Sequence, residues 1–116
     1  MEHYKVHVTN EAKADMRGAA RYIAVELREA DTAYSLLDRL DMEITSLEEL
    51  PERYSLVGDA YLASLGIRMT MVGHYLIFYS VDRISYTVTI LRMLHGRRGW
   101  INILTKQHAD GKPSST

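Results

Sequence analysis

The sequence predicts an α+β domain with the element order strand, helix, helix, strand, strand, strand. The first half contains two stretches whose apolar residues recur every three or four positions, which is the period of an amphipathic helix. The second half contains three short runs rich in aromatic and β-branched residues, separated by turn signals. This order favours a helical hairpin packed on one face of a mainly antiparallel four-stranded sheet.

The first strand is predicted at residues 3–9, where apolar and polar side chains alternate. Thr9 or Asn10 then supplies the N-cap of a helix over about residues 10–28. The apolar side chains of this segment recur at intervals of three and four, so they form one stripe that needs a surface to cover.

A second helix is predicted from about Asp31, and Pro51 ends it near Leu50 because proline cannot continue a helix. About three residues separate the two helices, which favours an antiparallel hairpin. Residues 52–66 lack a sustained period and should form a connecting loop, with a short turn at residues 60–64.

Three strands are predicted in the second half of the chain, at residues 67–72, 75–81 and 86–94. Gly73-His74 and residues 82–85 supply short turns, so these strands form an antiparallel meander. The first strand should join them beside the middle or the last strand. We expect a single domain over residues 1–105, in which residues 101–107 form a last helical turn or cap the core, and a polar, disordered tail over residues 106–116.

The composition excludes several classes of protein. There is no cysteine, so disulfides and thiolate metal ligands are absent, and none of the five histidines forms a close pair of the H-x-x-x-H kind. We therefore expect no metal and no cofactor. No apolar run is long enough to span a bilayer, and the first residues lack the basic-then-apolar order of a secretory signal, so we expect a cytoplasmic protein.

The net charge of -1 hides an asymmetry. From Arg92 onward the chain carries five Lys or Arg residues and one acidic residue, for a net charge of +4, whereas residues 1–91 carry nine against fourteen, for a net charge of -5. Proteins that bind nucleic acid along its backbone usually have a strong overall positive field. This chain has only a local basic patch.

The last predicted strand runs directly into that patch. Arg92, His95, Arg97 and Arg98 fall within seven residues and could form a catalytic edge, an anion-binding edge or the solvated end of a core strand. Counting by two from Ile90 places Arg92 on the same face of the sheet. If that face is buried, Arg92 needs a partner or a groove.

Three stretches together resemble the RelE/ParE superfamily of bacterial toxins from type II toxin-antitoxin pairs: LPERYSLV, LASLGIRMTMVGHYLIFYSVD and YTVTILRMLHGRRGWINIL. The resemblance covers residues 3–104. Its more specific features are Arg68 at the start of the second strand, the run from Val72 to Tyr79, and the R-x-L-H-x-R-R pattern of residues 92–98.

This resemblance implies a small intracellular toxin that is held inactive by a cognate antitoxin encoded beside it. The antitoxin lays a helix and an extended segment across the toxin, and the pair could assemble as a heterotetramer. RelE-like members cut messenger RNA in the ribosomal A site, whereas ParE-like members bind DNA gyrase and have no ribonuclease activity.

Metal-independent RNA cleavage needs a base, cations for the charge on the phosphorus, and an acid. Arg68 with Arg92 or Arg97 could hold the phosphate, and His95 could act as base or acid. However, the loop before Arg68 contains no lysine, and Trp100 stands where a C-terminal tyrosine would be expected. These departures favour a ParE-like toxin that binds gyrase over a ribonuclease, and a toxin fold that retains only antitoxin binding stays open.

We therefore expect the residues that bind the antitoxin or the target to be Arg92, His95, Arg97, Arg98 and Trp100. An exposed strand edge should also be covered, because an unpaired edge invites an added strand. The simplest structural alternatives are that Arg68 pairs with the acids at the end of the second helix, and that His95 donates a hydrogen bond to a strand-end carbonyl.

Overall fold

A computed structural model describes residues 2–109. Its elements are β1 (Lys5–Val8), α1 (Asn10–Arg21), the π-helical segment η1 (Tyr22–Glu26), α2 (Ala30–Ser46), the 3-10 helix η2 (Pro51–Arg53), α3 (Ala60–Ser64), β2 (Arg68–Val72), β3 (Tyr75–Asp82), β4 (Thr87–His95) and α4 (Trp100–Ala109). The predicted α+β class and the succession of one strand, two long helices and three strands are confirmed.

The four strands form one sheet in the order β1-β4-β3-β2. The pairs β2–β3 and β3–β4 are antiparallel, whereas β1 lies parallel to β4. The first strand therefore joins the meander beside its last strand, which is one of the two positions predicted. This arrangement makes β4 an inner strand over its first half, up to the point where β1 ends.

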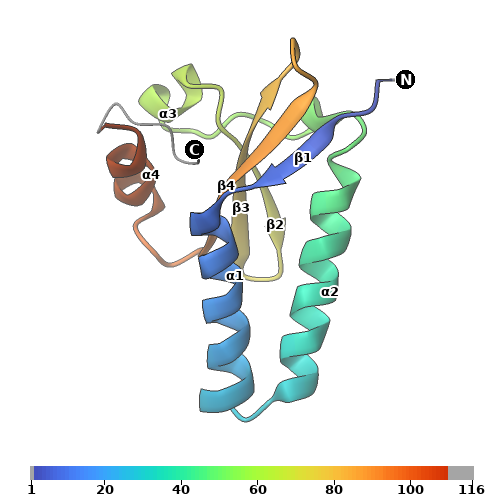
Figure 1. Cartoon of the computed structure of the whole chain (residues 1–116). Coiled ribbons are helices and arrows are strands. Elements are labelled where there is room, and N and C mark those ends of the chain that lie inside the picture. Colours follow the sequence, from blue (N-terminus) through green and yellow to red (C-terminus); the bar gives the residue numbers. More distant parts are fainter. Residues whose placement is uncertain (1, 110–116) are drawn as a thin grey trace.

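Both faces of the sheet are covered (Figure 1). The hairpin of α1 and α2 packs on one face, over a core that includes Leu40, Ile77 and Val88. On the other face α3 and α4 enclose a second core, in which Leu62 and Leu104 are fully buried. The sequence predicted only the first of these layers, because the segments that form the second are short and have no clear period.

Thr9 joins the start of α1 to the centre of the sheet. Its side chain accepts the Ala12 N–H at 3.1 Å, as an N-cap should, and donates to the Leu91 carbonyl at 3.0 Å. Its own N–H donates to the Ile90 carbonyl. One buried threonine thus fixes where β1 ends and where the helix begins.

The second long helix ends earlier than predicted. α2 stops at Ser46, four residues before Leu50, and Leu50 itself takes a left-handed conformation with φ 47°. Pro51 does not end the long helix but begins the short helix η2, where its missing N–H costs nothing. The intervening residues form turns.

A β-bulge interrupts β4 and changes the face on which Arg92 lies. Ile90 pairs with Tyr79, but the next pair joins Arg92 to Phe78, so Leu91 is the extra residue. Because cross-strand partners share a face, Arg92 stands opposite Phe78 of the second core and not beside Ile90. The face obtained by counting along the strand is therefore wrong.

The C-terminal segment is helical as far as Ala109. The first four residues of the predicted polar tail, 106–109, thus belong to α4, and that part of the expectation is wrong. The rest of the predicted tail, residues 110–116, lies outside the described residues.

Candidate functional site

The end of β4 is held against the β2–β3 turn. Tyr75, the first residue of β3, pairs with His95, the last of β4, and the Gly96 N–H donates to the His74 carbonyl at 2.8 Å. The rings of His74 and His95 stack with their centroids 6.1 Å apart, and the Tyr75 ring meets His95 edge-on at 5.4 Å. Two histidines distant in the sequence therefore lie side by side.

The residues that follow His95 orient its ring. The ring Nδ1 accepts the Arg97 N–H at 3.2 Å, and the His95 carbonyl accepts the Arg98 N–H at 2.9 Å. Within residues 2–109 the ring donates to no carbonyl and instead accepts from a backbone N–H, so the expectation of a ring-to-carbonyl bond is wrong. With Nδ1 accepting, a neutral His95 carries its proton on Nε2, which is the atom left to meet a partner.

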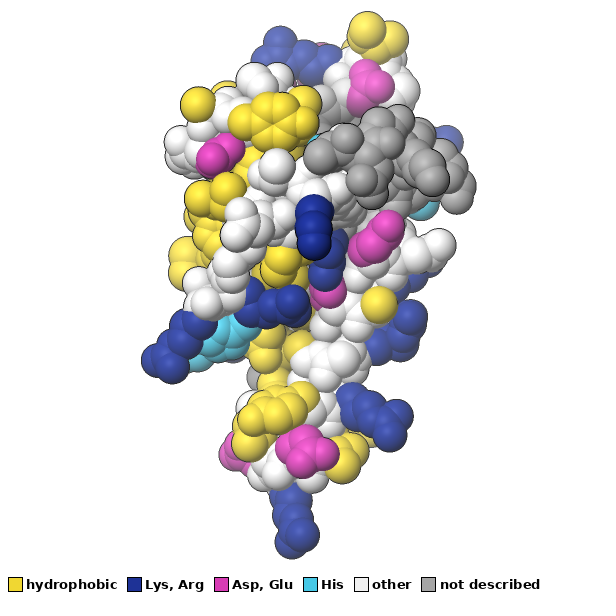
Figure 2. Space-filling view, turned by 90° about the vertical axis from the view of Figure 1, so that its left-hand side faces the viewer, with side chains coloured by type: hydrophobic (Ala, Val, Ile, Leu, Met, Phe, Trp, Pro, Cys, Tyr) yellow, Lys and Arg dark blue, Asp and Glu magenta, His cyan; other side chains and the backbone are white. Residues whose placement is uncertain are grey.

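Arg97 and Arg98 project from the loop between β4 and α4. Both side chains are exposed, and within residues 2–109 neither has an ion pair or a side-chain hydrogen bond. Figure 2 shows histidine side chains lying among Lys and Arg side chains at one edge of the molecule, next to hydrophobic side chains. Unneutralised charge beside apolar surface suits an acidic partner that also has apolar groups.

Two grooves meet at this end of the molecule. The larger, of about 580 Å³, lies between α1 and the end of β4, and small residues of α1 line one side of it: Ala14, Gly18 and Ala19. The smaller, of about 340 Å³, lies between the helical hairpin and the β2–β3 turn. Three residues line both grooves: Tyr22, Tyr75 and His95.

The π-helical segment η1 places Tyr22 at this junction. The Leu27 N–H donates to the Tyr22 carbonyl five residues earlier, so one turn of the helix is wider than an α-turn. Counting at the α-helical period puts Leu27 on the buried stripe with Ile23. The wider turn leaves Leu27 48% exposed and Tyr22 55% exposed, and no pattern in the sequence indicates it.

Arg92 has the partner that its position requires. Its Nε and Nη2 donate to the two carboxylate oxygens of Asp15 in α1 at 2.6 and 2.8 Å, and the Met93 N–H donates to the same carboxylate at 3.1 Å. The hydrogen bonds to Asp15 raise the pKa of Arg92 above its ordinary value. Arg92 therefore joins α1 to β4, and its charge is neutralised.

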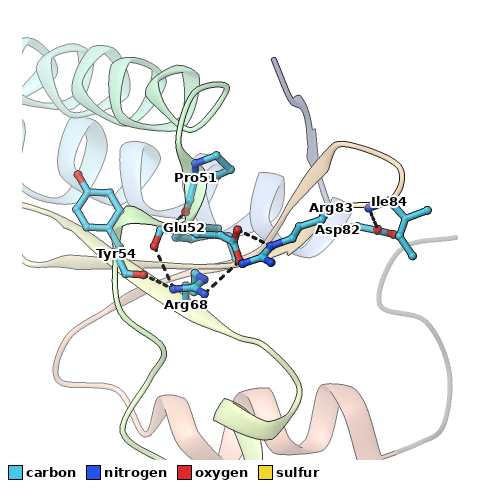
Figure 3. Close-up of polar contacts among 8 residues, drawn as sticks. Pro51, Glu52, Tyr54, Arg68, Asp82, Arg83 and Ile84 are labelled. Atoms are coloured by element: carbon cyan, nitrogen blue, oxygen red, sulfur yellow. Dashed lines mark hydrogen bonds and ion pairs between the residues drawn. The ribbon is translucent and has the colours of Figure 1, made fainter. Parts of the chain in front are cut away.

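Arg68 lies in a second polar cluster with Glu52 and Arg83 (Figure 3). Its guanidinium donates to the Tyr54 carbonyl at 2.6 Å and lies 3.4 Å from the Glu52 carboxylate, which also accepts two hydrogen bonds from Arg83. The hydrogen bonds from Arg83 lower the pKa of Glu52. Arg68 thus pairs with an acid, as predicted, but this acid is Glu52 of η2 and lies beyond the end of α2.

Trp100 is the first residue of α4 and is half-buried. Its ring packs against Phe78 at a centroid distance of 5.1 Å, within the second core. The side chain therefore anchors α4 to the sheet, and only part of its surface is left to contact a partner.

One of the two edge strands of the sheet, β2, is largely paired with the chain itself. Along β2, the Val57 N–H donates to the Ile67 carbonyl at 3.0 Å and the Met69 N–H to the Ser55 carbonyl at 3.4 Å. Beyond the end of β1, the edge of β4 meets α1 through Asp15. Among the bonds of residues 2–109, the outer edge of β1 and the end of β2 near the turn have no such partner.

The structure brings together His95, Arg97 and Arg98, but not the complete set of candidate nuclease residues. Arg68 pairs with Tyr79, four positions along β3 from the Tyr75–His95 pair. At roughly 3.3 Å per residue and 4.8 Å per strand, Arg68 and His95 lie on the order of 16 Å apart. Arg92 is engaged with Asp15, so of the candidate cations only Arg97 lies free beside His95.

Two residues near His95 were not singled out as site residues from the sequence. His74 reaches it through the β2–β3 turn, and Arg39 of α2 extends its guanidinium over Gly73, where an added Cβ would lie 3.6 Å from the nearest guanidinium nitrogen. The turn signal at Gly73-His74 could have suggested the first contact, because it fixes the β2–β3 register. No signal in the sequence relates Arg39 to the turn.

Residues 2–109 contain no cluster of three or more His, Cys, Asp or Glu side chains able to hold a metal ion. Among the same residues, no helix combines the length and apolarity needed to cross a membrane.

The family model of the ParE toxin of the type II toxin-antitoxin system parDE matches residues 6–100. The chain belongs to this family of toxins. Comparison with curated protein sequences gives no significant match.

Solved structures show a similar fold. A chain from the chromosomal ParDE toxin-antitoxin system of P. aeruginosa superposes with a TM-score of 0.67 at 14% identity, covering 82% of this chain and 98% of that one. A chain from the RelBE2 toxin-antitoxin complex of Mycobacterium tuberculosis superposes with a TM-score of 0.55 at 23% identity, covering 80% of this chain and 98% of that one. At these identities the likeness shows the fold alone.

Proposed function

We propose that this protein arrests growth when free and is neutralised by a cognate antitoxin that docks at the end of β4. The family match over residues 6–100 supports the toxin role. The exposed, unpaired Arg97 and Arg98 beside the groove of about 580 Å³ support the place of docking. An acidic segment with apolar side chains complements this surface in both charge and shape.

The target we propose is DNA gyrase, bound in the ParE-like manner without RNA cleavage. The observation that carries this proposal is the dispersal of the candidate nuclease residues. Arg92 is held by Asp15, and Arg68 lies with Glu52 at another part of the sheet. A metal-independent nuclease needs its base, acid and phosphate-binding cations around one phosphorus atom.

The target is tested by two assays on the same purified protein. We expect inhibition of gyrase-catalysed DNA supercoiling, and no codon-dependent messenger cuts when the protein is added to translating ribosomes. The variant R97A/R98A should lose inhibition, while K106A, which removes an exposed charge of α4, should retain it. Messenger cleavage that disappears in His95→Ala would instead establish the RelE-like alternative.

Toxicity itself is tested by expression with and without the neighbouring gene. We expect growth to stop when the toxin is expressed alone and to recover on co-expression with the antitoxin. Normal growth at high levels of folded protein would mean that the chain retains antitoxin binding only. The mass of the purified complex checks the proposed heterotetramer of two toxins and two antitoxins.

A further inference from the structure

We propose that the smaller groove, of about 340 Å³, binds a phosphate-bearing nucleotide, with Arg39, His74 and His95 around the phosphate and Tyr22 against the base. Neither the family match nor the proposed action on gyrase assigns such a site. The volume lies within the range of small-molecule sites in proteins, at its lower end.

The backbone builds the cationic end of this groove. Gly73 has φ 58°, a left-handed conformation that lets β2 turn back into β3, and the Gly96 N–H fixes the turn through the His74 carbonyl. This bond and the Tyr75–His95 pair hold the two imidazoles in their stack. The positions of both rings are thus set by the sheet and not by a free loop.

Arg39 supplies the permanent charge. It reaches from α2 to the turn, and within residues 2–109 its guanidinium has no ion pair or side-chain hydrogen bond. The planar guanidinium donates two parallel hydrogen bonds to phosphate oxygens, which makes arginine well suited to this anion. Among the described residues that line the groove, Glu29 is the one carboxylate.

The remaining lining fits the other half of a nucleotide. Tyr22, 55% exposed at the π-helical turn, and Tyr75 present aromatic rings to the same space. A base can stack on an aromatic ring, and such stacking tolerates any base. Thr32 and Ser35 of α2 line the groove with hydroxyl groups that can hydrogen-bond to a sugar.

The site and the proposed antitoxin groove share Tyr22, Tyr75 and His95. A partner bound along α1 would therefore exclude a nucleotide. Arg39 and His74, in contrast, line the smaller groove and not the larger one. This separation lets Arg39 be changed without altering the proposed antitoxin groove.

The test follows the imidazole NMR signals of the purified full-length chain during titration with adenosine monophosphate, inorganic phosphate, and hexamers of deoxythymidine and uridine. We expect the signals of His74 and His95 to shift, and those of His3, His7 and His108 to stay. Because loss of a charged hydrogen-bond donor costs about 1.5–3 kcal/mol, Arg39→Gln should weaken binding on the order of tenfold or more. Lys106→Gln, the matched control, should bind as the unaltered chain does.

Saturation by the monophosphate as readily as by the hexamers would identify a free nucleotide as the ligand, and much tighter binding of either hexamer would identify a nucleic acid strand. Uniform shifts of all five histidines, no shifts, or equal weakening by both variants would overturn the site. Because the experiment contains no gyrase and no antitoxin, its failure would leave the proposed toxin action untouched, and a failed supercoiling assay would leave this site untouched.

Discussion

Asp15 is the residue on which the contact between α1 and the end of β4 depends. Its carboxylate accepts two hydrogen bonds from Arg92 and one from the Met93 N–H, and both side chains of the ion pair are mostly buried. Removing the carboxylate leaves a cation and a backbone donor without partners, which costs more than the pair itself contributes.

We therefore expect Asp15→Ala to lower the free energy of unfolding by about 3 kcal/mol, measured by urea denaturation. The matched control is Arg83→Ala, which breaks the Glu52–Arg83 ion pair. Because the Arg83 side chain is 74% exposed, its loss should change stability much less. Equal effects of the two substitutions would contradict the structural role given to Asp15.

Tyr79 makes the stability of the protein depend on pH in the alkaline range. The side chain is fully buried and its hydroxyl donates to the Pro51 carbonyl at 2.7 Å, and burial raises its pKa to about 12. An unfolded tyrosine ionises near pH 10, so the folded state holds its proton more tightly. This contribution to stability is complete below pH 10 and is lost as the pH rises towards 12.

We expect the urea midpoint to fall between pH 9 and pH 11 more steeply in the unaltered protein than in Tyr79→Phe. The substitution should also cost about 1 kcal/mol at neutral pH, because the Pro51 carbonyl loses its donor. Parallel pH profiles for the two proteins would show that Tyr79 is not the titrating group.

The sequence was sufficient to predict that Arg92 needs a partner. It was not sufficient to identify that partner or the face of the sheet on which Arg92 lies. An arginine within an apolar strand had to be neutralised, and this holds on whichever face it lies. The bulge at Leu91 has no signature in the sequence, so counting by two failed there. Asp15 could not be selected from the first helix because the distance between α1 and β4 depends on where β1 ends.

At the scale of elements, α1 contains a glycine for which the isolated protein shows no structural reason. Gly18 lies in the middle of the helix, and a Cβ added there would meet nothing within 4 Å. Glycine destabilises a helix interior by about 1 kcal/mol relative to alanine. The residue lines the groove proposed for the antitoxin, where a bare backbone lets a partner approach closely.

We expect Gly18→Ala and Gly18→Leu each to raise the free energy of unfolding by about 1 kcal/mol, whereas only the leucine should fill the groove and weaken antitoxin binding tenfold or more. Unfolding in urea and calorimetric titration with the antitoxin measure the two effects. Gly73→Ala, at φ 58°, should instead destabilise the protein. Unchanged antitoxin affinity in Gly18→Leu would place the antitoxin elsewhere.

The elements that could be predicted are those whose periodic pattern extends over many residues or that are bounded by a strong turn signal. The two long helices and the meander satisfy this condition, and their order was sufficient for the fold. The short helix α3 was expected only as a turn, and α4 carries few apolar residues before its polar end, so the second layer of the sheet was not predicted. Burial of Leu104 is a tertiary effect that no local pattern records.

At the scale of the molecule, charge is distributed unevenly between the body and the end of β4. The free cations Arg97 and Arg98 contrast with a net charge of -5 over residues 1–91. Such a patch accelerates association with an acidic partner and loses its effect as salt screens it.

We expect the double variant R97E/R98E to slow association with the antitoxin on the order of tenfold at low salt, with the difference shrinking at high salt, as measured by stopped-flow fluorescence. Lys106→Glu is the control for charge alone. Arg92→Glu is a poor probe of docking, because it places two carboxylates together at Asp15 and should lower stability first. An association rate that is unchanged in R97E/R98E would rule out docking at this end.

The parallel pairing of β1 with β4 also determines when, during synthesis, the sheet of the toxin can form. Lys5 pairs with Thr87, so β1 has no hydrogen-bonded neighbour in the sheet until β4 has been synthesised. Contacts so distant along the chain form late in folding. A nascent chain that ends at residue 86 should therefore stay unfolded by circular dichroism, and an antitoxin that recognises the end of β4 would meet each new toxin only as it completes its sheet.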